Sequence, residues 1–168
     1  MNKRIWLSTA IALSALTAFQ VNANDTLVAI NPQTLSQGEN AKLRANDKTG
    51  SGYTQAIGDF DGDGKPDHAS LKLEKPGSTA FKLVVALSTD AGGEHVLKSG
   101  ANIQAVGIQT VKPGRYKTAC GQGAGTADAS CGEAVNVPHD GISLFTFESA
   151  AVVLYAQDGV FKEVWVTD

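Results

Sequence analysis

The chain has 168 residues, of which 42% are hydrophobic and 18% are charged, and its formal net charge at pH 7 is −3. This length suits a single domain. Nucleic-acid-binding proteins neutralise phosphates with clustered Lys and Arg side chains, and the sequence has no such cluster. The composition therefore argues against a nucleic-acid partner.

The first residues have the pattern of a secretory signal peptide. Lys3 and Arg4 give a basic start, and the stretch IWLSTAIALSALTAF is apolar and small for 15 residues. A membrane span needs about 20 apolar residues, so this stretch is short for one, although a retained anchor is the alternative. We predict a signal peptide at 1–23, cleaved after Ala23, and no membrane span after its removal. The remaining chain, 24–168, has a formal charge of −5, because the signal removes two basic residues and no acidic ones. It is expected to be periplasmic or secreted.

The segment 24–50 has one short apolar run, LVAI, followed by polar sequence, which predicts either a short helix or a loose N-terminal arm. A strand is expected at 53–58. In 68–74 apolar and polar residues alternate, and the same period of two recurs in 81–88. Turn residues, KPGST, separate these two segments, so 68–88 predicts a hairpin.

Further strands are predicted where β-branched and aromatic residues lie between turn signals: 95–98, 103–111, 115–120, 142–147, 151–156 and 160–166. The dipeptide Asp158-Gly159 is a strong hairpin-turn signal, because both positions must accept a positive φ. No long helical apolar stripe follows the signal. The predicted fold class is mainly β: an antiparallel sheet system of about eight to ten strands, sandwich or barrel-like, in one domain.

Two cysteines, Cys120 and Cys131, flank a stretch of small residues without periodicity, which we expect to form a loop at 121–130. An even number of cysteines in an exported chain predicts a disulfide between them. Closing a loop of this size stabilises a fold by roughly 3 kcal/mol in the chain-entropy model. Two free thiols, or half of a metal site, are the alternatives.

The stretch DFDGDGKPD, residues 59–67, places four aspartates in nine residues. Calcium takes six to eight oxygen ligands, and a linear loop supplies them when carboxylates recur at every second residue. The predicted ligands fall at positions 1, 3, 5, 7 and 9 of an EF-hand loop: Asp59, Asp61, Asp63, Lys65 through its backbone carbonyl, and Asp67. Gly64 falls at position 6, where that loop turns sharply. The sequence thus predicts a Ca²⁺ site rather than an exposed acidic turn, because four carboxylates this close repel one another unless a cation lies between them.

Position 12 departs from the EF-hand pattern. Ser70 stands where an EF-hand has a bidentate Glu, and the flanking sequences resemble strands rather than helices. The expected affinity is therefore that of extracellular modules, about 10⁻⁴–10⁻³ M. A remote acid, Glu94, Asp128 or Glu133, could complete the ligand set, and the sequence leaves that choice open.

The stretch IGDFDGDGKPDHASL resembles the calcium loop of FG-GAP/VCBS-type repeats, in which an Asp-rich loop joins two strands of a sheet. Those repeats occur in arrays that build propellers, and no second D-x-D-G-D-G is present here, so a propeller is not expected. The resemblance implies the ligands named above and no activity. The stretches KPGRYKTACGQG and FESA…VWVTD resemble small exported bacterial proteins of uncharacterised function.

Other residues that could carry chemistry fit structural roles better. His68 could support the loop's ligands, but a solvent-facing strand residue is expected. His139-Asp140 lacks a third partner at a spacing typical of catalysis or zinc binding, which predicts a turn. The sequence GISLF does not match the G-x-S-x-G elbow, so Ser143 is expected in a strand.

The sequence predicts a non-catalytic, calcium-binding β-domain that acts as a binding module for an envelope or extracellular protein or glycan. The alternative is a small secreted hydrolase, or an enzyme inhibitor that uses the 121–130 loop. A continuous exposed aromatic patch would favour the binding module. An acid and a Ser close to His139 in one cleft would favour the enzyme. Three aromatic residues could line a sugar-binding face, but core packing is expected for them: Tyr155, Phe161 and Trp165.

Overall fold

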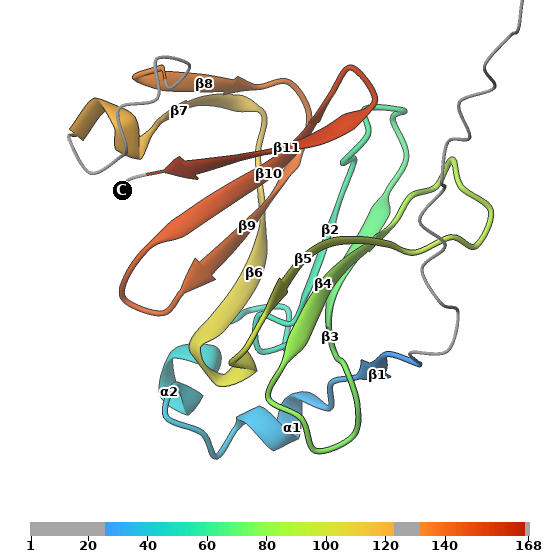
Figure 1. Cartoon of the computed structure of the whole chain (residues 1–168), viewed down its shortest axis with the longest axis vertical. Helices are drawn as coiled ribbons and strands as arrows, with labels where there is room; N and C mark the ends of the chain where they lie inside the picture. Colours follow the sequence, from blue (N-terminus) through green and yellow to red (C-terminus); the bar gives the residue numbers. More distant parts are fainter. Residues whose placement is uncertain (1–25, 123–131, 167–168) are drawn as a thin grey trace, which may run out of the picture.

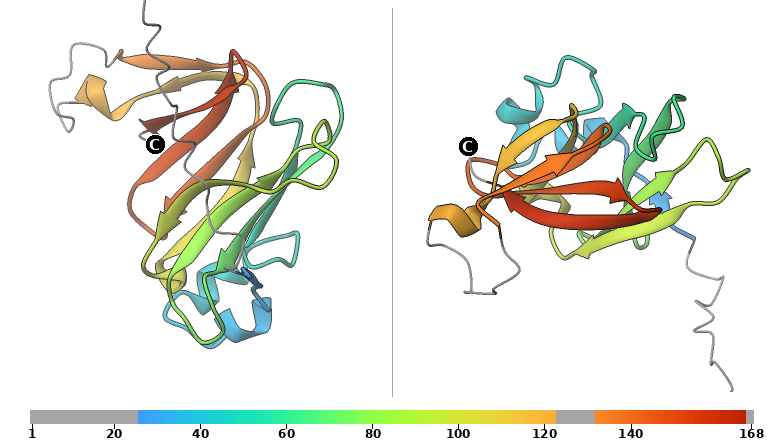
Figure 2. Two further views of the ribbon diagram at one scale, coloured as in Figure 1. Left: turned by 45° about the vertical axis from the view of Figure 1, so that its right-hand side comes forward. Right: turned by 90° about the horizontal axis from the view of Figure 1, so that it is seen from above.

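A computed structural model of the chain describes residues 26–122 and 132–166. The predicted signal peptide lies outside these residues. The mainly β class is confirmed: two open antiparallel sheets face each other, and the strand pairings of the described residues close no barrel (Figures 1 and 2). The sandwich, not the barrel, is therefore the correct alternative.

The first sheet has five strands: β1 (Val28–Ala29), β2 (Gln55–Gly58), β3 (Asp67–Leu73), β4 (Phe81–Ala86) and β5 (His95–Gly100). The predicted hairpin is confirmed, since β3 pairs antiparallel with β4. The strands β1 and β2 pair with opposite ends of β3, and Gly58 at the end of β2 lies opposite Asp67. The Asp-rich loop therefore joins two paired strands, as the sequence predicts.

The second sheet has the order β11-β10-β9-β6, formed by β6 (Val106–Val111), β9 (Gly141–Thr146), β10 (Ala151–Gln157) and β11 (Val160–Val166). Asp158 and Gly159 join the last two strands with φ values of 55° and 76°, which confirms the predicted hairpin turn. The predicted strand 103–111 starts later than expected. Its first residues form the 3₁₀ turn η1 (Ile103–Ala105), because the Asn102 side chain accepts a hydrogen bond from Gln104 N and caps that turn.

The main core lies between the two sheets. Strand alternation directs Leu71 and Leu83 from the first sheet toward Ile108 and Ile142 of the second, and each is at most 2% exposed. Phe60, from the Asp-rich loop, is also fully buried in this core. The loop is therefore attached to the hydrophobic interior by its own side chain.

A third, two-stranded sheet packs on the outside of the second. It consists of β7 (Gly114–Lys117) and β8 (Ala134–Val137). Val137, Val153 and Tyr155 form a small second core between this hairpin and the sheet. Strands β1 and β8 were not predicted, because β1 has only two residues and β8 follows the stretch 121–130, which lacks periodicity.

The predicted strand 115–120 is shorter than expected. It ends at Lys117, and the 3₁₀ turn η2 (Ala119–Gln122), which includes Cys120, follows it. Cys131 and most of the 121–130 loop lie outside the described residues. The Cys120–Cys131 disulfide therefore stays a prediction.

The described part of the N-terminal segment contains β1 and two short helices, α1 (Pro32–Leu35) and α2 (Ala41–Arg44), at one end of the sandwich (Figure 1). Arg44 is only 4% exposed and donates hydrogen bonds to the carbonyl oxygens of Gly52 (2.6 Å), Ile103 (2.7 Å) and Val106 (2.7 Å). Burial lowers the pKa of Arg44. No helix in the described ranges has the length and hydropathy that a membrane crossing requires.

Arg44 therefore fastens α2 to the segments that enter β2 and β6. We expect Arg44→Met to destabilise the protein by about 3 kcal/mol, because it keeps the apolar stem but leaves three carbonyls without their donor. Urea denaturation measures this loss. The exposed neighbour Lys42 on the same helix is the control, and Lys42→Met should stay within about 0.5 kcal/mol of wild type. Equal losses in both variants would contradict the role of the carbonyl contacts.

Asp47 holds the turn between α2 and β2. Its carboxylate accepts hydrogen bonds from Thr49 N and Tyr53 N, both 2.9 Å, and from the hydroxyls of Thr49 and Ser51, both 2.8 Å. Burial raises the pKa of Asp47, but these bonds to the charged form outweigh it and lower the pKa to about 2. Asp47 therefore stabilises the fold above its unfolded pKa, and this contribution is lost as the pH falls from about 4 to about 2.

We expect Asp47→Asn to lower stability at neutral pH and to flatten the loss of stability between about pH 4 and pH 2. Thr49→Val, which removes one hydroxyl donor and keeps the carboxylate, should give an intermediate profile. Urea denaturation at several pH values tests this. A parallel acid profile for Asp47→Asn and wild type would rule out the linkage.

Candidate metal centre

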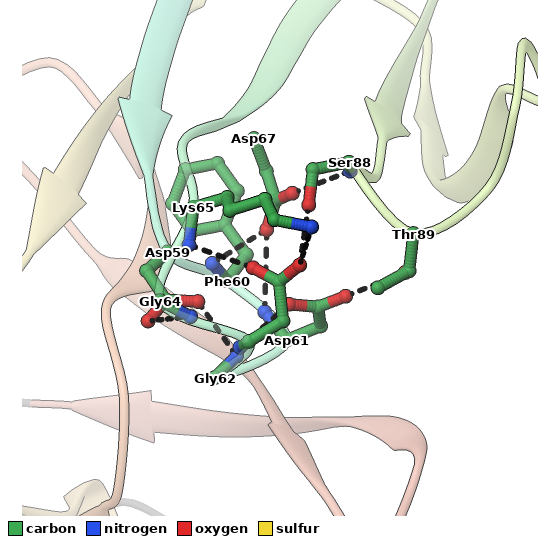
Figure 3. Close-up of polar contacts among 10 residues, drawn as sticks. Asp59, Phe60, Asp61, Gly62, Gly64, Lys65, Asp67, Ser88 and Thr89 are labelled. Atoms are coloured by element: carbon green, nitrogen blue, oxygen red, sulfur yellow. Dashed lines mark hydrogen bonds and ion pairs between the residues drawn. The ribbon is translucent and has the colours of Figure 1, made fainter.

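The loop 59–66 leaves β2 and enters β3, and it carries the aspartates that the sequence singles out (Figure 3). Asp67, the last aspartate of the motif and the first residue of β3, is fully buried. Its Oδ2 accepts hydrogen bonds from Phe60 N (2.8 Å) and Asp61 N (3.3 Å), and its Oδ1 accepts one from Ser88 N (2.7 Å). One carboxylate therefore ties the start of the loop to the segment that follows β4.

Asp59 organises the tip of the loop. Its two oxygens accept hydrogen bonds from Gly62 N (2.8 Å) and Gly64 N (3.1 Å). Gly62 and Gly64 have φ values of 82° and 84°, in the left-handed region that side chains rarely adopt. The two glycines of the motif thus let the backbone fold around the carboxylate.

Asp61 and Asp63 reach the connection between β4 and β5. Thr89 donates its hydroxyl to Asp61 Oδ2, and Ser88 donates its hydroxyl to Asp63 Oδ2, both at 2.7 Å (Figure 3). The Ser88 hydroxyl, the backbone N–H of Lys65 and the charge of Lys65, whose Nζ lies 3.6 Å away, hold the pKa of Asp63 below its usual value.

Asp59, Asp61 and Asp67 form a group that could hold a metal ion: each offers a carboxylate oxygen, and these oxygens lie within 4.8 Å of one another. Two unit charges about 4–5 Å apart repel by about 3–4 kcal/mol at an effective dielectric constant of about 20, and water weakens this for the half-exposed Asp59 and Asp61. A cation between these oxygens would remove that repulsion.

Asp63 and Lys65 are not part of this group. The Asp63 carboxylate is directed at Ser88, and the backbone N–H of Lys65 donates to it at 2.7 Å. Their predicted role as ligands, including the Lys65 carbonyl, stays a prediction.

The remote acids do not join the group within the described ranges. Glu94 forms an ion pair with Lys72 at 2.5 Å. Glu133 is exposed directly before β8, and its carbonyl oxygen accepts a hydrogen bond from Thr118 N at 3.0 Å. Asp128 lies outside the described residues.

The contact between the loop and the connection from β8 to β9 was not predicted from the sequence. Asp140 Oδ2 accepts a hydrogen bond from Asp59 N at 3.3 Å and lies 3.2 Å from Lys112 Nζ. The His139 ring lies against Gly62, where any β-carbon would collide with it. His139-Asp140 therefore forms a loop, as predicted, but one that supports the aspartate cluster. The one sequence signal for this position is that Asp140 comes shortly before the predicted strand 142–147, which places Asp140 at the end of a sheet.

The other candidate residues mostly have the expected structural roles. His68 is exposed on β3, and Ser143 is a buried residue of β9. Tyr155 is buried and Phe161 packs against the main core, as expected. The core prediction is wrong for Trp165, which is 53% exposed, because it extends from the edge strand β11.

Comparisons with models of protein families, with curated proteins and with solved structures gave no match to this chain. The resemblance to FG-GAP/VCBS-type repeats therefore stays a prediction that rests on the loop residues alone.

The two glycines of the loop give a direct test of its packing. Gly62→Ala should destabilise the protein more than Gly64→Ala, because both need a positive φ, but only the former places a methyl group against the His139 ring. We expect about 1–2 kcal/mol for Gly64→Ala from backbone strain alone, and at least 1 kcal/mol more for Gly62→Ala. Chemical denaturation measures both.

Adding His139→Ala should remove the extra cost of Gly62→Ala and leave the effect of Gly64→Ala unchanged. Equal destabilisation by the two glycine variants would show that the His139 contact does not constrain the loop.

Proposed function

We propose that this chain is an exported β-domain that binds Ca²⁺ in the 59–67 loop, and that the ion is structural rather than catalytic. The observation that carries the proposal is the convergence of three carboxylate oxygens, from Asp59, Asp61 and Asp67, within 4.8 Å in a loop with EF-hand spacing. An all-oxygen set of this kind suits a hard cation.

Calcium fits the loop better than magnesium. Calcium takes six to eight oxygens in flexible geometry, whereas magnesium requires an octahedron and keeps several waters. In the proposal, the carboxylates of Asp59, Asp61 and Asp67 bind the ion. The exposed Asp63 carboxylate gives up its hydrogen bond from the Ser88 hydroxyl and binds the ion instead. Lys65 adds its backbone carbonyl oxygen as a further ligand. Waters supply the remaining ligands, because the bidentate Glu of an EF-hand is absent.

The bound ion would stabilise the fold by joining segments that are far apart in the sequence. Asp67 and Asp61 contact Ser88 and Thr89 after β4, and Asp59 N donates to Asp140 before β9. Neutralising the cluster would remove repulsion at the point where these segments meet, so ligand binding and folding stability are linked. A site with about 10⁻⁴–10⁻³ M affinity fills only where calcium is millimolar, which agrees with an exported protein.

We also propose that the domain is a binding module, with an envelope or extracellular protein or glycan as its partner. The hydrolase alternative has less support. His139 lies against Gly62, whereas Ser143 lies on the outer face of the second sheet, so these two residues do not form one cleft with an acid in the described ranges.

Calcium should raise the melting temperature, and Asp61→Asn should abolish most of this rise. At ~10 mM calcium, a Kd of about 10⁻⁴–10⁻³ M stabilises the folded state by about 1.4–2.7 kcal/mol, equivalent to about 3–10 °C. Thermal unfolding with calcium, with magnesium and with a chelator measures the shift, and magnesium should give a smaller one.

Asp158→Asn is the matched control, because it removes the same charge from a distant turn where Asn tolerates the positive φ. It should keep the full calcium-dependent rise. A wild-type melting temperature that is the same in calcium and in chelator would contradict the proposal.

A further inference from the structure

The outer face of the second sheet is covered only in part. Strand alternation places Gln109, Ser143 and Phe145 on the face opposite to the main core. The β7–β8 hairpin covers one part of this face. Between the hairpin and the segment 43–53, a groove of about 620 Å³ stays open. This volume lies within the range of about 300–1,000 Å³ that is typical of ligand sites.

One wall of the groove is a fixed set of aromatic rings. Tyr53, Phe145 and Phe147 pack edge to face, with ring centroids 5.3–6.0 Å apart. The Arg44 guanidinium lies 4.8 Å from the Phe147 centroid and is itself held by backbone carbonyls. Tyr116 faces the groove from the hairpin. These rings are half-buried, so each keeps a surface that a ligand can contact.

Polar groups without partners line the floor and rim. Ser143 is only 4% exposed, and its hydroxyl has no hydrogen-bond partner in the described part of the chain. Gln109 lies directly opposite Ser143 on the neighbouring strand, and Asn46 lies on the opposite rim. Their amides are also without partners among the described residues. The Ser143 hydroxyl lines the groove and is available to a ligand that brings hydrogen-bonding groups.

The charge of the groove favours neutral ligands over anionic ones. Glu148 is the one acidic or basic side chain among the described lining residues, and no Lys, Arg or His lines the groove. Glu148 and Tyr53 also have positive φ values, 58° and 61°, which are unfavourable for side chains of this size. Backbone strain of this kind clusters at binding sites, where the surrounding structure holds it.

Two other ligand classes fit less well. A purely apolar ligand would bury Ser143 and the two amides without partners. A peptide that binds by strand addition needs a free sheet edge. Here β9 lies between β6 and β10, and at the outer edge of β6 Ile108 N already donates to the carbonyl oxygen of Tyr53 at 2.8 Å. A neutral sugar has apolar C–H faces for the rings and hydroxyls for the amides. We propose that this groove binds a neutral oligosaccharide.

This site shares no residue with the aspartate loop, so the inference goes beyond the calcium proposal and does not rest on it. The test titrates isotope-labelled protein with maltotriose, cellotriose and chitotriose, and with trigalacturonate as the anionic comparison. Amide resonances are followed by NMR in calcium and in chelator. Concentrations up to ~10 mM detect binding with a millimolar Kd.

At least one neutral trisaccharide should shift the amides of β6 and β9, both in calcium and in chelator, and trigalacturonate should not. The double variant Gln109→Ala/Asn46→Ala should weaken this binding by about tenfold or more. The matched control, Gln55→Ala/Asn136→Ala, removes the same two side-chain types from exposed positions outside the groove and should bind as wild type does.

Three results would overturn the inference. In the first, none of the three neutral trisaccharides shifts the groove resonances. In the second, the Gln109→Ala/Asn46→Ala protein binds as tightly as wild type. In the third, trigalacturonate binds at least as tightly as the neutral sugars. None of these results bears on whether the aspartate loop binds calcium.

Discussion

The buried carboxylate of Asp67 is the constraint on which the geometry of the loop depends. Because this carboxylate is fully buried, its oxygens need hydrogen-bond donors from the protein, and three backbone N–H groups supply them. Two of these come from the start of the loop and the third comes from Ser88, beyond β4. A charge that is buried without donors would be strongly destabilising, so the loop and the β4–β5 connection must adopt their positions together.

The hydrophobic pattern predicted the elements that bury one face. Where alternation extends over six or seven residues, as in β3 and β4, the predicted and observed strands agree closely. The pattern failed at β1, which has two residues, and at β8, and it failed where a local side-chain cap competes with a strand, as Asn102 does before β6. Arg44 shows a further limit, because only the tertiary fold brings three carbonyls around one guanidinium.

The site was predictable to the extent that it is local. Asp59, Asp61 and Asp67 were identified by spacing, because a loop between paired strands keeps residues that are close in sequence close in space. Ser88 and Thr89 lie more than twenty residues from the aspartates that they contact, and Asp140 lies 81 residues from Asp59. No spacing rule connects such positions. The direction of the Asp63 side chain depends on Ser88 and was beyond sequence reasoning for the same reason.

The hydrogen bonds inside the loop do not compete with a cation. A carboxylate has about four acceptor positions. Asp67 uses three of them on backbone N–H groups, and Asp59 uses two. Each therefore keeps at least one position for a metal ion, and a cation can bind without breaking the bonds that shape the loop. The same backbone donors stabilise the carboxylates when no ion is bound, which limits the repulsion among them. This arrangement predicts a loop that keeps its backbone conformation on binding, so that the ion adds stability without having to order the chain.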